Sequence, residues 1–254
     1  NVSAGLLTGI GVAFTSFSLA MACIARVVGP ERRTLALGLG ASAGSMGQVV
    51  FSPLSLLFIN QFGWSMALTL LAGCLMLMIP LAFVLPKDAS EGHVEKATLS
   101  LKHALAEAMR HRGFVLLCAG FFVCGFHVSF ISVHFPAYVV DLGLDSSVAA
   151  YALALIGLVN IIGAFLGGAA GQRWSKKSTL SVIYFLRGLL FAGLIIASPS
   201  AWTIYAFAVG MGFLWLSTVP LTGAIVGQVF GLKWMGALFG LTMLAHQFGS
   251  VLGV

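Results

Sequence analysis

Histidine and arginine side chains inside long uncharged stretches are the residues of this sequence best suited to chemistry. His127 and His134 are seven residues apart, two helical turns, so a helix would place them on one face. Imidazole titrates near neutral pH and can donate a hydrogen bond to an anion. Arg187 and His246 each lie in a stretch without carboxylates. Because polar groups are costly in apolar surroundings, each of these residues is a candidate functional residue.

The composition indicates which surroundings these side chains occupy. Hydrophobic residues make up 59% of the chain and charged residues 8%, with a mean hydropathy of +1.05. An ordinary soluble domain has roughly 25% charged residues. The excess of 13 basic over 7 acidic residues does not indicate nucleic acid, because the charges fall in short clusters between long neutral runs. The sequence therefore predicts an all-α protein that crosses a membrane several times.

The neutral runs define the crossings, since a helix needs about 20 apolar residues to span the hydrocarbon. The runs are apolar on all faces, which favours helices over the alternating strands of a membrane barrel. Turn residues at 60–64 and 198–200 divide two long runs. We predict eight membrane helices, over approximately 3–25, 34–59, 64–85, 113–140, 146–171, 178–197, 202–228 and 235–254.

The basic residues orient these helices. Of the 13 basic residues, 12 fall on loops of one side, and the opposite loops carry none, so the positive-inside rule makes that side cytoplasmic. The 12 residues are Arg26, Arg32, Arg33, Lys87, Lys96, Lys102, Arg110, Arg112, Arg173, Lys176, Lys177 and Lys233. The long hydrophilic stretch 87–112 is then a cytoplasmic linker, in which Ser100 could cap a short surface helix with Leu101, Leu105 and Met109 on one face.

Several motifs resemble known transporters. Arg32 to Leu39, reading RRTLALGL, with Gly47 and then Phe62-Gly63-Trp64, resembles the monocarboxylate transporter branch of the major facilitator superfamily. Residues 168–177, reading GAAGQRWSKK, resemble the cytoplasmic loop signature of that superfamily, with Gln172 in place of its Asp. Phe230-Gly231 and Phe239-Gly240-Leu241 also resemble oxalate and formate exchangers.

The resemblance implies a truncated major facilitator bundle that holds helices four to eleven of twelve. Residues 1–86 would be the last three helices of the N-terminal bundle and 113–254 the first five of the C-terminal bundle. A weak internal repeat, in which Gly38, Ala43 and Gly47 recur as Gly240, Ala245 and Gly249, fits two similar halves, although small residues are common in membrane helices. Gly38 and Gly167-Gly168 are interpreted as close helix contacts, not phosphate loops.

The resemblance also implies a function: a secondary transporter, by symport or antiport and without covalent chemistry, of a small solute such as a monocarboxylate or dicarboxylate. An exporter of hydrophobic compounds and a transporter-like membrane sensor are the alternatives. An intramembrane enzyme with His127, His134 and His246 as zinc ligands is disfavoured, because the sequence has no HExxH motif and no carboxylate at membrane depth.

The expected solute pathway comprises His246, His127, Asn160, Trp215, Arg187 and Gln247. His246 leads, because it lies about 17 Å into its helix, near the midplane. Arg187, about 13 Å deep, could instead pair with carbonyls or a helix end. Asn160 and Gln247 could instead join neighbouring helices. The branch's charged pair is replaced by Asn160 and Ala164, which puts a lactate-type mechanism in doubt.

The conformational loop should anchor two helices and tie the inward-closed state together; its residues are Arg173, Lys176, Lys177, Arg32 and Arg33. Neither cofactor nor metal is expected, and Cys23, Cys74, Cys118 and Cys124 lie within apolar spans, where cysteine behaves as a small hydrophobe. The expected partners are a small solute, protons as a candidate coupling ion, and the bilayer, with no nucleic acid. A monomer in a bacterial inner membrane is the expected form.

The predicted orientation can be checked by labelling single cysteines in intact cells. Positions 61, 142 and 200 should react with an impermeant reagent from outside, and positions 89, 175 and 232 only after the membrane is opened, because basic loops stay cytoplasmic. Labelling of a cysteine at Ser175 from outside would overturn this orientation.

Overall fold

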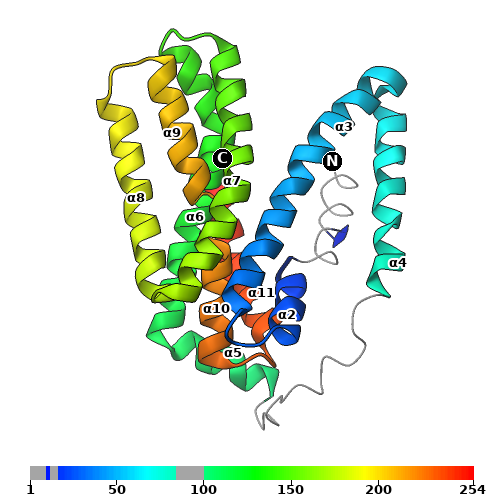
Figure 1. Cartoon of the computed structure of the whole chain (residues 1–254), viewed down its shortest axis with the longest axis vertical. Coiled ribbons are helices and arrows are strands. Elements are labelled where there is room, and N and C mark those ends of the chain that lie inside the picture. Colours follow the sequence, from blue (N-terminus) through cyan, green and yellow to red (C-terminus); the bar gives the residue numbers. More distant parts are fainter. Residues whose placement is uncertain (1–9, 12–16, 84–99) are drawn as a thin grey trace.

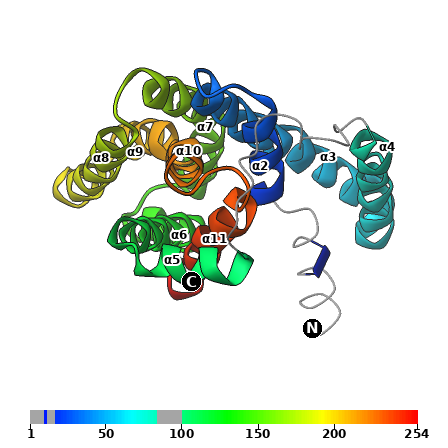
Figure 2. The same cartoon turned by 90° about the horizontal axis from the view of Figure 1, so that it is seen from below.

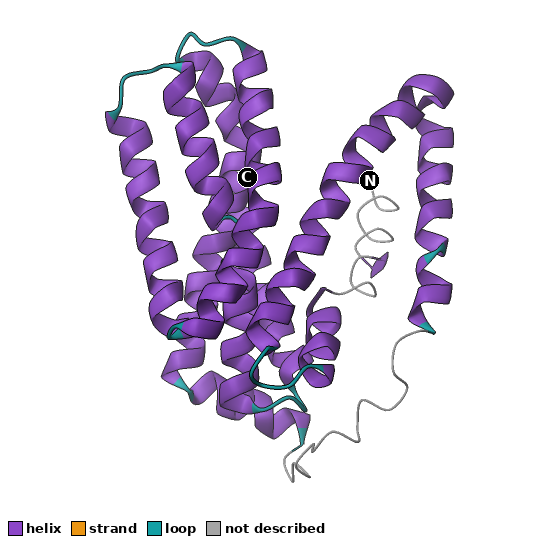
Figure 3. Cartoon of the chain, in the orientation of Figure 1, coloured by secondary structure: helices purple, strands orange, loops and turns teal. Residues whose placement is uncertain are grey.

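The structure is a computed structural model that describes residues 10–11, 17–83 and 100–254. Within these ranges all regular structure is helical, as Figure 3 shows. The helices are α2 (Phe17–Val27), α3 (Arg33–Met76), α4 (Met78–Ala82), α5 (Leu101–Arg110), α6 (Arg112–Asp141), α7 (Ser146–Arg173), α8 (Lys176–Ile196), α9 (Ala201–Leu214), α10 (Thr218–Phe230) and α11 (Met235–Leu252).

Seven segments of the described residues are long and apolar enough to cross a membrane. They are Arg33–Phe51, Leu57–Leu81, Arg112–Asp141, Ser146–Arg173, Lys176–Ile196, Ala201–Phe230 and Met235–Leu252. Each corresponds to one of the predicted crossings, so the all-α membrane class is confirmed. The first predicted crossing, 3–25, and the linker residues 87–99 lie largely or wholly outside the described residues; α2 is a shorter apolar helix.

The connections lie at the two ends of the bundle in the alternation that the basic residues predict. Figure 1 shows α5 and the α2–α3, α7–α8 and α10–α11 connections at one end, which carries the basic loops. The bend at 60–64 and the α6–α7 and α8–α9 connections lie at the other end. The end with α5 is predicted to face the cytoplasm from its basic residues, and it is called the cytoplasmic end below.

Local sequence signals fix where several helices begin. Ser100 accepts a hydrogen bond from the amide of His103 at 3.4 Å, which confirms the predicted cap of α5. Ser200 caps α9 through the amide of Thr203 at 3.1 Å. Asp145 caps α7 through the amide of Ser147 at 2.8 Å, and hydrogen bonds from Ser147 hold the pKa of the Asp145 carboxyl below its usual range.

The predicted turn at 60–64 is reduced to a kink within α3. Gly63 has φ +76° and ψ 166° and lies between two otherwise helical segments. Positive φ is open to glycine because it has no Cβ. The chain therefore reverses direction at a kink rather than through a loop, and the second part of α3, followed by α4, returns toward the cytoplasmic end (Figure 1).

The predicted helix 202–228 is one crossing made of two helices. Its first half, α9, ends at Leu214, and α10 begins at Thr218. Pro220 has no amide hydrogen, and its ring would clash with the carbonyl of Leu216 four residues earlier in a continuous helix. The proline therefore favours a break near mid-membrane, which sequence periodicity alone did not predict.

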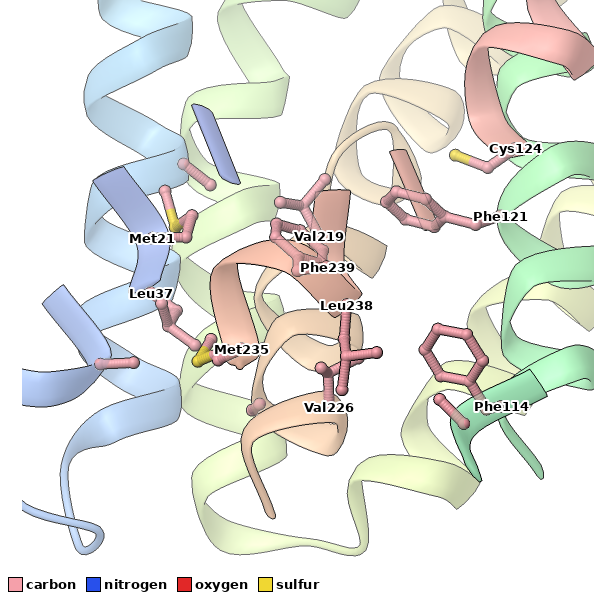
Figure 4. Packing of buried hydrophobic residues seen from close by; sticks show 14 of the residues in the cluster. Met21, Leu37, Phe114, Phe121, Cys124, Val219, Val226, Met235, Leu238 and Phe239 are labelled. Atoms are coloured by element: carbon pink, nitrogen blue, oxygen red, sulfur yellow. The ribbon is translucent and has the colours of Figure 1, made fainter. Parts of the chain in front are cut away.

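The N-terminal part, α2 to α4, joins the C-terminal part, α6 to α11, mainly near the cytoplasmic end. Figure 1 shows α3 close to α7 at that end and leaning away from it toward the other, and Figure 2 shows α2 beside α10 and α11. One hydrophobic cluster includes residues of both parts, as Figure 4 shows. Its labelled members are Met21, Leu37, Phe114, Phe121, Cys124, Val219, Val226, Met235, Leu238 and Phe239.

A pair of glycines lets α3 and α7 touch through their backbones. A Cβ added to Gly38 would lie 2.9 Å from the Cα of Gly168, and one added to Gly168 would lie 2.8 Å from the Cα of Gly38. Ser42 lies one turn further along α3 and donates to the carbonyl of Ile161 at 2.8 Å. The predicted close contact is confirmed for Gly38 and Gly168, which bring the two parts together.

Replacing Gly38 by alanine should destabilise the protein, because the new methyl group has only backbone to push against. Overpacking of this kind costs about 1–3 kcal/mol, and each kcal/mol lowers Tm by roughly 2–4 °C in a domain of this size. Thermal melting of the purified protein would measure this loss. Gly188→Ala is the matched control, because nothing lies within 4 Å of that Cβ position; equal Tm values for the two variants would contradict the contact.

Candidate solute site at a helix break

Arg187 caps the broken end of α9. Its side chain is fully buried, with 0% exposure, and its Nε donates to the carbonyl of Leu214 at 3.2 Å. The Nη2 group donates to the carbonyls of Leu214 and Trp215. The last carbonyls of a helix have no intrahelical donor, and a cation at this end is favoured by the helix dipole. The geometry therefore favours the pairing with a helix end over direct solute contact for Arg187.

Cys124 of α6 lies beside the same guanidinium. The Nη1 group of Arg187 is 3.1 Å from Cys124 Sγ, and the hydroxyl of Thr218, at the start of α10, is 3.6 Å from that sulfur. His246 of α11 lies close by, because its ring packs against Phe121, one turn before Cys124 on α6. Side chains of α8 and α10 thus contact a thiol of α6 at the level of the break, and α11 packs against α6 beside it. Cys124 was predicted to be only a small hydrophobe, so this part of the site was missed.

His246 lies beside this cluster and has a polar atom without a hydrogen-bond partner among the described residues. Its ring packs against Phe121 with centroids 5.4 Å apart. The Nδ1 atom is buried and has no hydrogen-bond partner among the described residues. The helices are close here, because a Cβ on Gly125 would meet the carbonyl oxygen of His246 at 1.9 Å. Gln247, the next residue, is exposed and is not brought into the cluster.

His127 lies one turn from Cys124 on α6 and packs against α8. Its ring is 4.9 Å from that of Phe191, and its buried Nδ1 also has no hydrogen-bond partner in the part of the chain that the structure describes. His134 is exposed, and its Nε2 lies 3.1 Å from the carbonyl oxygen of Val254. The structure therefore keeps His134 apart from the cluster around Cys124.

Asn160 bridges helices, which was one of the two interpretations left open. Its side chain is 1% exposed and donates from Nδ2 to Ser45 Oγ at 2.8 Å. Its Oδ1 accepts from the amide of Leu216 at 2.9 Å, within the break. Trp215, beside Leu216, is half-buried against the core of the C-terminal part. Asn160 thus ties α3, α7 and the break together.

The hydrogen bonds that join the two parts at the cytoplasmic end come from residues outside the set predicted for the conformational loop. Arg26 of α2 donates to the carbonyls of Leu232 at 3.4 Å and Lys233 at 3.1 Å, in the α10–α11 connection. The Oε1 atom of Gln172 accepts from the amide of Thr34 at 3.2 Å. In the sequence, the sign that pointed to the contact between Gln172 and Thr34 was that Gln172 stands where the loop signature has Asp.

The predicted conformational loop has a different arrangement. Arg32, Arg173 and Lys177 are exposed. Arg33 donates to the carbonyl of Ala25 at 2.9 Å, within the N-terminal part. Lys176 and Lys177 line a cavity of about 650 Å³ between α6, α8 and α10. The role of this loop in closure stays a prediction.

The described residues form seven membrane-length helical segments, one of them broken where polar side chains converge, as in an integral multi-pass membrane protein. The family described as "Major Facilitator Superfamily" matches residues 2–254. The chain belongs to this superfamily, whose members are transporters and not enzymes.

Individual relatives support the monocarboxylate transporter resemblance. The chain is 27% identical to monocarboxylate transporter 13 of Rattus norvegicus, over 99% of this chain and 58% of that protein. It is 26% identical to monocarboxylate transporter 4 of Gallus gallus, over 99% and 55%. An uncharacterized MFS-type transporter, YcxA of Bacillus subtilis (strain 168), is 25% identical over 87% and 55%. The chain thus spans little more than half the length of these relatives.

Replacing Arg187 separates a structural role from solute contact. Arg187→Gln leaves the carbonyls at the end of α9 short of donors, and each unsatisfied buried group costs about 1–3 kcal/mol. We expect a clear loss of Tm, partly restored by Arg187→Lys, which retains the charge without the planar fork. Arg112→Gln, at an exposed arginine, is the control. A variant that melts like the parent but no longer binds solute would contradict the capping role.

Proposed function

We propose that this protein is a secondary active transporter that moves a small organic anion, a monocarboxylate or a dicarboxylate, by alternating access. The observation that carries the proposal is the charge of the membrane interior. In the described crossings the interior holds Arg187 and His246, whereas Asp141, the carboxylate that these segments include, ends α6. A buried positive region without an acidic group favours an anionic solute. The names of the relatives agree with this class of solute.

The proposed solute contact is His246. It is half-buried rather than fully enclosed, and its Nδ1 is available for a hydrogen bond. Its place in α11 puts it about 17 Å from Met235 by helical rise, near the midplane. The neighbouring start of α10 is the positive end of a half-helix, which also attracts an anion. His127 is the second candidate, because its Nδ1 is free as well.

The arrangement of the two parts supports alternating access. Contacts between them come from Arg26, Gln172 and the glycine pair near the cytoplasmic end, and from Asn160 deeper in the membrane. Further along α3, Met46 and Val50 are exposed. In this proposal residues 1–86 and 113–254 are the two halves, 87–112 links them, and opening toward the cytosol breaks the contacts of Arg26 and Gln172. The basic loop around Arg173 anchors α7 and α8 during this motion.

The proposed setting is a monomer in a membrane, without nucleic acid, with protons as the candidate coupling ion. The bacterial inner membrane stays a prediction, because the relatives come from vertebrates as well as from Bacillus subtilis.

Counterflow in proteoliposomes tests the proposed function. Vesicles with the intact protein are loaded with one unlabelled carboxylate at a time and given the same labelled compound outside. We expect labelled mono- or dicarboxylate to accumulate transiently, and His246→Ala to lose most of this signal. Gln247→Ala is the matched control, because that side chain is the next one along and is exposed.

Three outcomes would redirect the proposal. Binding of a carboxylate without counterflow indicates a sensor. Counterflow of hydrophobic cations or neutral compounds alone indicates an exporter of such compounds. Unchanged affinity in folded His246→Ala removes this residue from the site and leaves His127 as the better candidate.

A further inference from the structure

The buried charge of Arg187 lacks a carboxylate partner in the described part of the chain. The described acidic residues are Glu31, Glu107, Asp141 and Asp145, and all lie in connections, in the linker or at a helix end. The guanidinium is satisfied by two carbonyls, by Cys124 Sγ and by the ring of Tyr184, whose centroid is 5.7 Å away. An uncompensated charge in a low-dielectric interior is costly, so a counter-charge at this place would be strongly stabilised.

Cys124 is the group in this cluster that can supply the counter-charge. A thiolate beside an arginine is stabilised by that cation, and it accepts hydrogen bonds far better than a neutral thiol does. The Arg187 Nη1 group points at the sulfur from 3.1 Å. The other cysteine of α6, Cys118, has no arginine within hydrogen-bond distance among the described residues.

His246 connects this thiol to the proposed solute site. Cys124 is fully buried, whereas His246 is half-buried and packs its ring against Phe121, one turn before Cys124 on α6. The groups in contact with the sulfur are Arg187 from α8 and Thr218 from α10. His246 of α11, His127 one turn along α6 and Tyr184 beside Arg187 are the other titratable groups close by. Of these groups, the imidazole of His246 is suited to pass a proton between the proposed solute site and the sulfur.

We propose that Cys124 is the proton-carrying group of this transporter, loaded and unloaded through His246. This inference rests on the proposed function. In the empty state the Cys124 thiolate neutralises Arg187. A proton that arrives through His246 forms the S–H bond, and the positive charge of Arg187 is then left for the carboxylate of the solute to balance. Proton and anion therefore bind together and leave together, so one complete step moves no net charge.

The experiment compares two kinds of transport by the intact protein in proteoliposomes. Counterflow exchanges solute without net proton movement, whereas net uptake driven by an inward proton gradient needs the proton carrier. In Cys124→Ser, whose hydroxyl does not ionise, we expect gradient-driven uptake to fall by about tenfold, which is within the usual range of coupling between two sites. Counterflow should fall less than gradient-driven uptake, so the ratio of the two rates separates proton coupling from solute binding. Cys118→Ser is the matched control on the same helix, and Cys124→Asp should restore gradient-driven uptake.

Parental gradient-driven uptake by Cys124→Ser would overturn the inference, whereas absence of counterflow in the parent would overturn the proposed function instead. A second measurement tests the inference without Cys124→Ser, in case that variant does not fold. The ultraviolet absorbance of the thiolate in the purified parent and in Cys118→Ser should decrease when the transported carboxylate is added, because the bound solute brings a proton to Cys124. An unchanged thiolate signal in both proteins would also overturn the inference.

Discussion

The break between α9 and α10 is the constraint on which the rest of the site depends. Inside a bilayer, backbone groups released by a broken helix find no water, so the protein has to supply their partners. Arg187 supplies donors to the carbonyls of Leu214 and Trp215, and Asn160 supplies an acceptor to the amide of Leu216. The most polar residues of the membrane interior are therefore placed by the needs of the backbone as well as by the solute.

This arrangement links the site to the motion of the two halves. Asn160 holds the break with one end of its amide and Ser45 of the N-terminal part with the other. A movement of α3 relative to α7 would therefore displace the break. It would also displace Cys124, because Arg187 contacts both the break and the sulfur of Cys124. In the proposed cycle the charge at Cys124, the solute at His246 and the contact between halves change together.

The sequence predicted the crossings because span length and hydropathy are local properties. The depth of His246 could be predicted in the same way, since depth follows from helical rise, whereas its contact with solute stays a prediction. The break between α9 and α10 was not predicted. The hydrophobic run continues through Pro220 without interruption, so hydropathy alone gives no sign that the helix ends there. Cys124 and Arg26 were missed for a different reason: their partners, Arg187 and the carbonyl of Lys233, are distant in sequence, and only tertiary packing brings them together.

The central claim is that the membrane interior of this protein forms a positively charged site for an anion. Its most direct test is equilibrium binding to the purified intact protein of a small carboxylate and of its uncharged amide, which has nearly the same shape. We expect the carboxylate to bind clearly more tightly, because only it balances the charge of Arg187. An amide that binds as tightly as the carboxylate would contradict the account.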